Sequence, residues 1–160
     1  MNLSEALMAG GIKELSSSEK YGAINELIEL ADQKGLLNDK AKFKEAVVNR
    51  ERQQSTGLEN GVAVPHALSE GVREVFACLG ISKDGVEFQT LDGKPAKLIF
   101  LIGAPPAMNT DYLSVLSKVA RMFIRPEMRR KVLEAPSPED VMRIIKEEEL
   151  RMSGGAGLFR

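Results

Sequence analysis

Apolar and polar residues follow a helical period in the first third of the chain. Between residues 16 and 35 apolar side chains recur every three to four positions, which predicts an amphipathic helix. Ser16 and Glu19 have the spacing of a capping box at its start, and Gly35 suits the left-handed residue that follows a helix. The same spacing predicts a second helix that begins near residue 38 or 39 and fades at RQQSTG.

Short apolar runs then replace the helical spacing. Residues 62–65 (VAVP) predict a short strand that its proline ends. Residues 74–82 and 97–104 are nearly continuous apolar runs, typical of interior strands covered on both faces. KDGVEF predicts a turn with a brief strand, and LDGKP predicts another turn. A further short strand at residues 11–15 is expected at an edge of the sheet.

Helical spacing returns in the last third of the chain. Residues 109–123 predict a helix whose buried face consists of Leu113, Leu116, Val119, Ala120 and Phe123. A last helix is expected with Ser137 as its N-cap and Pro138 as its first residue, running to about Arg151.

This order of elements predicts an α/β fold. Two interior strands need helices on both faces, so we expect a three-layer α/β/α sandwich around a mixed sheet of about five strands. No linker or internal repeat divides the chain, and we expect one domain over residues 1–152 with a flexible tail over 153–160.

Composition narrows the class of protein. Lys and Arg (22) nearly balance Asp and Glu (23), so no basic excess indicates a nucleic-acid binder. No apolar run reaches the roughly 18 residues of a membrane span, and no signal peptide is evident. The one cysteine, Cys78, is expected to be a buried small residue, and with one histidine it excludes a Cys/His zinc site. We therefore expect a cytoplasmic protein with neither metal nor cofactor.

His66 is the single histidine, and it follows Pro65 at the end of an apolar run. Because a proline biases the preceding residue to extended backbone, the strand should run straight into His66 and then give way to a loop. A loop at a strand end is a usual place for a working side chain. A neutral imidazole is nucleophilic at pH 7 without a metal.

Potential phosphate ligands precede this histidine in the chain. Ser55 and Thr56 carry hydroxyl donors, and Gly57 lets backbone N–H groups approach an anion. Arg50 offers a guanidinium fork that matches phosphate geometry, whereas Arg52 is expected to be a solvated helix charge. This pattern predicts a site for a phosphoryl group carried on nitrogen. The alternative is that His66 is a surface or capping residue.

Partner docking at such a site requires exposed apolar residues around the histidine. The candidates are Ala67, Leu68, Pro105, Pro106, Ala107 and Met108. For the APPAM stretch the alternative is a plain loop that leads into the next helix.

Three motifs carry a family resemblance. NRERQQSTGLENGVAVPH, KDGVEFQTLDGKPAKLIFLIGAP and YLSVLSKVARMF resemble the EIIA domain of the bacterial phosphoenolpyruvate-dependent phosphotransferase system, in its fructose, mannitol and nitrogen-regulatory class. The resemblance covers roughly residues 3–150 and implies a three-layer domain whose histidine is phosphorylated by a small histidine phosphocarrier protein. It implies that His66 is the phosphorylated residue, that Arg50 stabilises the phosphate and that Thr56 bonds its oxygens.

One position departs from the pattern of that family. Many members carry a second histidine where Tyr112 stands in DYL. Tyrosine can donate a hydrogen bond to a phosphate but is no base near pH 7, since its pKa is about 10.

The resemblance leaves three functions open. The first is a phosphoryl relay of the nitrogen-regulatory type, which the absence of further domains or membrane segments in the sequence favours. The second is a soluble EIIA subunit of a fructose or mannitol transporter, which passes phosphate to an EIIB domain. The third is a regulatory module whose binding to a target protein is switched by phosphorylation of His66.

Overall fold

The chain forms six α-helices and five strands in the part that the structure describes. The computed structural model describes the backbone of residues 1–158 and the side chains of residues 1–153. In chain order the elements are α1 (Leu3–Gly10), β1 (Gly11–Glu14), α2 (Lys20–Gln33), α3 (Lys40–Gln53), β2 (Val62–Ala63), β3 (His66–Leu68), β4 (Phe76–Val86), β5 (Ala96–Ala104), the 3-10 turn η1 (Pro106–Met108), α4 (Asn109–Phe123), α5 (Pro126–Glu134) and α6 (Pro138–Leu158).

The five strands make one mixed sheet, as predicted. Its order is β1-β4-β5-β2, and β3 also pairs with β5. β1 lies parallel to β4 at one edge, β4 and β5 are antiparallel in the centre, and β2 and β3 both run parallel to β5. The edge strand expected at residues 11–15 is confirmed.

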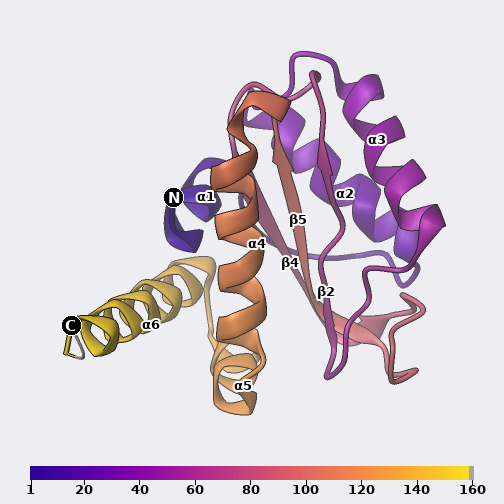
Figure 1. Ribbon diagram of the computed structural model, residues 1–160. Helices are drawn as coiled ribbons and strands as arrows, with labels where there is room; N and C mark the ends of the chain where they lie inside the picture. The colour runs from indigo at the N-terminus through magenta and orange to yellow at the C-terminus, as the bar shows by residue number, and fades with distance from the viewer. Residues whose placement is uncertain (159–160) are drawn as a thin grey trace.

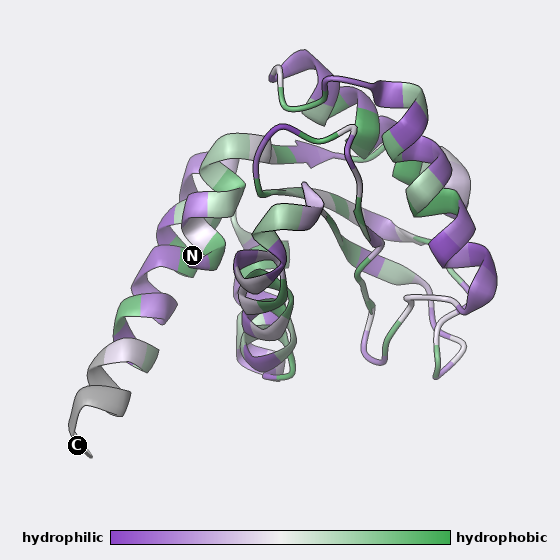
Figure 2. Ribbon diagram, turned by 45° about the horizontal axis from the view of Figure 1, so that its top comes forward, coloured by the Kyte–Doolittle hydropathy of each residue, from purple (hydrophilic) through white to green (hydrophobic). Residues whose placement is uncertain are grey.

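Helices cover both faces of this sheet, which confirms the three-layer sandwich. Alternate residues of β4 and β5 point to opposite sides: Leu79 and Phe100 join one apolar cluster, whereas Cys78 and Leu101 join the other. The first cluster lies under α1, α4, α5 and α6, and the second lies under α2 and α3 (Figure 1). The flanking helices are striped in purple and green, as expected when one face meets the sheet and the other meets solvent (Figure 2).

Local capping sets where the helices begin. Asp39 accepts the backbone N–H of Lys42 at 3.0 Å and starts α3, and the Ser137 hydroxyl accepts the N–H of Asp140 at 3.2 Å and starts α6. Both starts agree with the prediction. The predicted capping box of Ser16 and Glu19 is wrong. α2 begins only at Lys20, and the N–H of Ser16 donates to the carboxylate of Glu26 within the helix.

Several predicted boundaries need correction. α1 and α5 are short helices that the sequence pattern did not indicate. KDGVEF forms no separate turn and strand, since β4 continues to Val86 with an irregular register after Ile81. α6 continues past Arg151 to Leu158. The flexible tail predicted for residues 153–160 stays a prediction, and residues 159 and 160 lie outside the described part.

The predicted buried face of α4 is partly confirmed, since Val119 and Phe123 are buried and Leu116 is half-buried, but the face is rotated at the start of the helix. Leu113 is 53% exposed and Ala120 is also exposed, while Tyr112 and Val115 are buried against the sheet. Cys78 is buried as expected, and burial raises the pKa of its thiol to about 12. Over the part of the chain that the structure describes, no helix has the length and apolar character to cross a membrane.

Candidate functional site

His66 lies near the carboxyl end of β5, on the short strand β3 that runs parallel to it. It is the first residue of β3 and pairs in register with Ile102 of β5, so a short strand follows it where a loop was predicted. The carbonyl of Pro65 accepts the N–H of Ile102 at 3.1 Å. The pairing of β3 with β5 therefore fixes the position of the His66 backbone, from which the ring extends.

The His66 ring is oriented by a backbone carbonyl. Its Nδ1 lies 2.6 Å from the carbonyl oxygen of Val64, and a carbonyl oxygen only accepts hydrogen bonds, so Nδ1 carries the proton. Nε2 then holds the lone pair. Burial lowers the pKa of this half-buried imidazole, the Val64 bond opposes that shift, and the positive charge of Arg50 lowers the pKa further. The neutral, nucleophilic form is thus favoured.

A small cavity next to His66 gathers most of the residues that the sequence singled out, although Tyr112 does not line it. It measures about 210 Å³ and is lined by Arg50, Gln54, Ser55, Thr56, Gly57, Leu58, Val64, His66 and Leu91. Arg50 comes from the last turn of α3, where its Nη1 donates to the carbonyl of Gln54 at 2.8 Å. That bond uses one of the five guanidinium donors. Arg52 is exposed and does not line the cavity.

The donors of the 55–57 segment are engaged within the protein. The Ser55 hydroxyl donates to the carbonyl of Phe88 at 2.7 Å, and the Gly57 N–H donates to Ser55 at 3.1 Å. The Thr56 hydroxyl and N–H both donate to Glu51, at 2.6 and 2.8 Å. These three residues line the cavity, but their binding to phosphate stays a prediction and requires that these bonds rearrange.

Tyr112 lies beside the histidine on the first turns of α4. The centroids of the two rings are 6.0 Å apart with an interplanar angle of 55°. Burial raises the pKa of the Tyr112 hydroxyl to about 12, against the opposing charge of Arg50. The phenol is therefore neutral at pH 7 and keeps its proton available for donation.

The LDGKP turn packs against the segment that precedes His66, so two motifs that are distant in sequence meet. The N–H of Leu91 donates to the carbonyl of Gly57 at 3.2 Å, and Asp92 accepts the N–H of Asn60 at 2.9 Å. Leu91 is left 69% exposed beside the cavity. Sequence reasoning missed this residue, although an isolated leucine in a polar turn is a recognisable signal.

The predicted apolar rim is partly wrong. Ala67 is buried in the core under α2 and α3, because residues of β3 alternate between the faces of the sheet. Pro106 and Ala107 are exposed. Leu68 and Met108 are half-buried against the apolar cluster on the other face of the sheet, under α1, α4, α5 and α6.

A buried ion pair behind the cavity also escaped the sequence reasoning. The Lys20 Nζ lies 3.0 Å from Glu51, and their side chains are 6% and 0% exposed. The available signal was the helical spacing of α3, since Phe43, Val47 and Glu51 follow one another at intervals of four and share its buried face.

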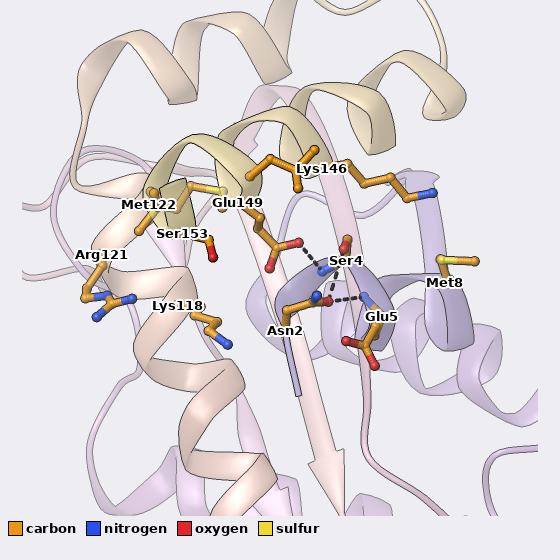
Figure 3. A pocket seen from close by; sticks show the side chains of 12 residues that line it. Asn2, Ser4, Glu5, Met8, Lys118, Arg121, Met122, Lys146, Glu149 and Ser153 are labelled. Carbon is orange, nitrogen blue, oxygen red and sulfur yellow. Dashed lines mark hydrogen bonds between the residues drawn. The ribbon is translucent and has the colours of Figure 1, made fainter. Parts of the chain in front are cut away.

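A cavity larger than the one beside His66 lies between α1, α4 and α6 (Figure 3). It measures about 670 Å³, and Glu149 at its wall accepts the N–H groups of Leu3 and Ser4. Among the described residues no three His, Cys, Asp or Glu side chains gather in a group that could hold a metal ion.

Comparison with known proteins gives one consistent family. The family model "Phosphoenolpyruvate-dependent sugar phosphotransferase system, EIIA 2" matches residues 12–148. A fructose-specific EIIA component of Haloferax volcanii is 35% identical over 128 residues, which cover 80% of this chain and 83% of that protein.

Other relatives differ in length or in name. The fructose-specific EIIABC component of Bacillus subtilis strain 168 is 39% identical over 150 residues, which are 93% of this chain but 24% of that protein. The crystal structure of nitrogen regulatory protein IIA-Ntr from Neisseria meningitidis superposes with a TM-score of 0.79 at 29% identity, covering 89% of this chain and 97% of that one.

Proposed function

Because the chain belongs to the EIIA 2 family of the phosphoenolpyruvate-dependent sugar phosphotransferase system, we propose that it is a phosphoryl relay that accepts phosphate on His66. One observation carries the proposal. The 2.6 Å contact between Nδ1 and the Val64 carbonyl leaves Nε2 as the free nucleophile, in a cavity that Arg50 also lines. Nitrogen bonded to phosphorus is the intermediate that such a pair is suited to form.

Transfer to His66 is a displacement between two imidazoles. The Nε2 lone pair of His66 forms the new bond to phosphorus, and the bond from phosphorus to the donor nitrogen breaks and returns its electron pair to the donor ring. The proton stays on Nδ1, where the Val64 carbonyl stabilises the charge that the ring gains. We propose that no cofactor takes part, because the donor is itself a phosphohistidine of similar energy.

Arg50 stabilises the transferring group in this proposal. The phosphoryl passes through a loose transition state whose charge lies on its three outer oxygens, so positioning and positive charge supply most of the catalysis. The guanidinium donors that Gln54 leaves unused are suited to bind two of those oxygens. The neutral Tyr112 hydroxyl is proposed to donate to the phosphate from the other side.

The partners are proposed from the chemistry of a relay. The donor is a small histidine phosphocarrier protein in the cytoplasm, and it docks on the exposed apolar residues Leu91, Pro106 and Ala107. The acceptor is an EIIB domain or a regulatory target. EIIB is suggested by the Bacillus subtilis relative, whose name joins an A with a B and a C component.

Two roles for this chain, which differ in the acceptor of the phosphate, each have their own support. The fold and 29% identity to IIA-Ntr of Neisseria meningitidis support a nitrogen-regulatory role, in which the phosphorylation state of His66 sets binding to a target. The identities of 39% and 35% to fructose-specific components support an EIIA subunit of a sugar transporter. Transfer of labelled phosphate from the protein to purified EIIB distinguishes them, because a purely regulatory protein keeps the label.

Phosphorylation of the purified protein tests the proposal. We expect phosphoenolpyruvate, enzyme I and the phosphocarrier to add one acid-labile phosphate, measured as a mass gain, to the wild-type chain and none to His66→Ala. Arg52→Ala is the matched control, since that arginine is exposed outside the cavity and its loss should leave labelling unchanged. Normal labelling of His66→Ala overturns the proposal.

A further inference from the structure

The ion pair of Lys20 and Glu51 lies directly behind the site. It joins the first residue of α2 to the last turn of α3, and both side chains are almost completely withdrawn from solvent. Two apolar residues of similar volume often stabilise a protein as well as a buried ion pair does. Stability alone therefore does not account for a charged pair at this place.

All three ammonium donors of Lys20 have acceptors. Its Nζ lies 3.0 Å from Glu51 Oε1, 3.0 Å from Gln89 Oε1 and 3.1 Å from Ser55 Oγ, and it stands 4.9 Å above the ring of Phe88. A lysine held in this way has no freedom to turn, and it fixes the carboxylate of Glu51 in a single orientation.

From Glu51 an unbroken series of hydrogen bonds leads to the histidine. Oε1 and Oε2 of Glu51 accept the N–H and the hydroxyl of Thr56, at 2.8 and 2.6 Å. The carbonyl of Thr56 accepts the N–H of Val64 at 3.1 Å. The carbonyl of Val64 then accepts the Nδ1 proton of His66 at 2.6 Å. Each bond fixes the group that makes the next one.

We propose that Glu51, held by Lys20, is a positioning residue for His66. By fixing Thr56 and through it Val64, the carboxylate keeps the Val64 carbonyl aligned with Nδ1, so that the proton stays on Nδ1 and Nε2 stays nucleophilic. Thr56 acts here as a link in the support of the ring, consistent with a hydroxyl that donates to Glu51. This inference rests on the proposed phosphoryl transfer for its effect on rate, but its effect on the ring is independent of that function.

Two variants weaken the series at different points. Thr56→Val removes only the 2.6 Å hydroxyl bond and keeps the shape of the side chain. The double variant Lys20→Met with Glu51→Gln removes both charges together, so that neither is left unpaired in the interior. Val132→Ala is the control, because this residue is 1% exposed on the opposite face of the sheet and its loss lowers stability without touching the series.

The readout is the ¹⁵N spectrum of the single histidine, with the rate of phosphorylation as a second measurement. We expect the wild-type and Val132→Ala proteins to show Nδ1 protonated and Nε2 free. In Thr56→Val and the double variant we expect the Nε2 resonance to move toward the protonated position and the rate to fall about tenfold, as a small misplacement of a reacting group does.

The possible results separate the positioning role of Glu51 from the proposed phosphoryl transfer. A wild-type tautomer signal in folded Thr56→Val overturns the positioning role, and so does an equal change in Val132→Ala. If the double variant fails to fold, Thr56→Val alone decides. If the wild-type protein accepts no phosphate, the proposed function fails, while the tautomer spectra still test the role of Glu51.

Discussion

At the scale of the residue, a single backbone carbonyl decides what His66 can do. Without the Val64 contact the imidazole would exchange its proton between two nitrogens, and either could face the cavity. Burial and Arg50 both disfavour the charged ring, so the site is adapted to hold a neutral imidazole before transfer. The same positive charge that favours the neutral ring is available to an incoming phosphate.

The lowered pKa of His66 gives a prediction about pH. We expect the ring to titrate below 6.5 in an NMR titration, and we expect the pKa to rise in Arg50→Gln because a nearby positive charge is removed. The unfolded chain binds this proton first, so the contribution of His66 to stability is present above about pH 6.5 and is lost as the pH falls toward the folded-state pKa. An unchanged pKa in Arg50→Gln would show that the guanidinium does not act on the ring.

The limits of sequence reasoning are also visible among the residues of the site. The meeting of His66 and Arg50 at one cavity was predictable, because a rare residue type and an arginine fork stand beside a loop rich in small donors. The contacts of Thr56 and Lys20 were not, because a hydroxyl or an ammonium can turn either to a ligand or to the interior. The choice depends on Glu51, which is brought to Lys20 only by the packing of α2 on α3.

At the scale of the element, the long strands were the most predictable parts and the short helices the least. A continuous apolar run is diagnostic of an interior strand, which describes β4 and β5 well. The eight residues of α1 are too few to show a helical period, and the helix is completed by groups distant in sequence. The buried face of α4 was predicted only in part, because Tyr112 packs inward beside His66 and leaves Leu113 in solvent, whereas Val119 and Phe123 are buried as predicted.

Glu149 of α6 caps the N-terminus of α1, which is far from it in sequence. Its carboxylate accepts the first two N–H groups of α1, from Leu3 at 2.6 Å and Ser4 at 3.0 Å. Figure 3 shows Glu149 facing Ser4. We expect Glu149→Ala to lower the free energy of unfolding by about 2 kcal/mol, measured by urea denaturation, because two charge-assisted bonds at a helix start are lost.

Glu147→Ala is the control for this prediction. Its carboxylate is exposed and makes one long ion pair with Arg143 at 3.4 Å, so its loss should cost less than about 0.5 kcal/mol. Similar urea midpoints for the two variants would show that α1 does not depend on α6 for its capping.

At the scale of the whole molecule, the three layers bring the site together from separate parts of the chain. β3 places His66 beside the end of β5, α2 and α3 contribute the buried ion pair and Arg50, and α4 contributes Tyr112. Figure 1 shows α2 and α3 on one side of the sheet and α4 on the other. The larger cavity of about 670 Å³ lies on the α1, α4 and α6 side and shares none of these residues. The proposed relay site is therefore built by all three layers of the sandwich and is separate from that larger cavity.

We propose above that phosphate is accepted at Nε2 of His66 while Nδ1 keeps its proton on the Val64 carbonyl. Because the chain has one histidine, ¹⁵N-histidine labelling reports on this ring alone. In a spectrum recorded during phosphorylation by the phosphocarrier, we expect coupling to phosphorus at Nε2 and a protonated Nδ1. Coupling at Nδ1, or a phosphorylated protein whose histidine signals stay unchanged, would contradict transfer to Nε2.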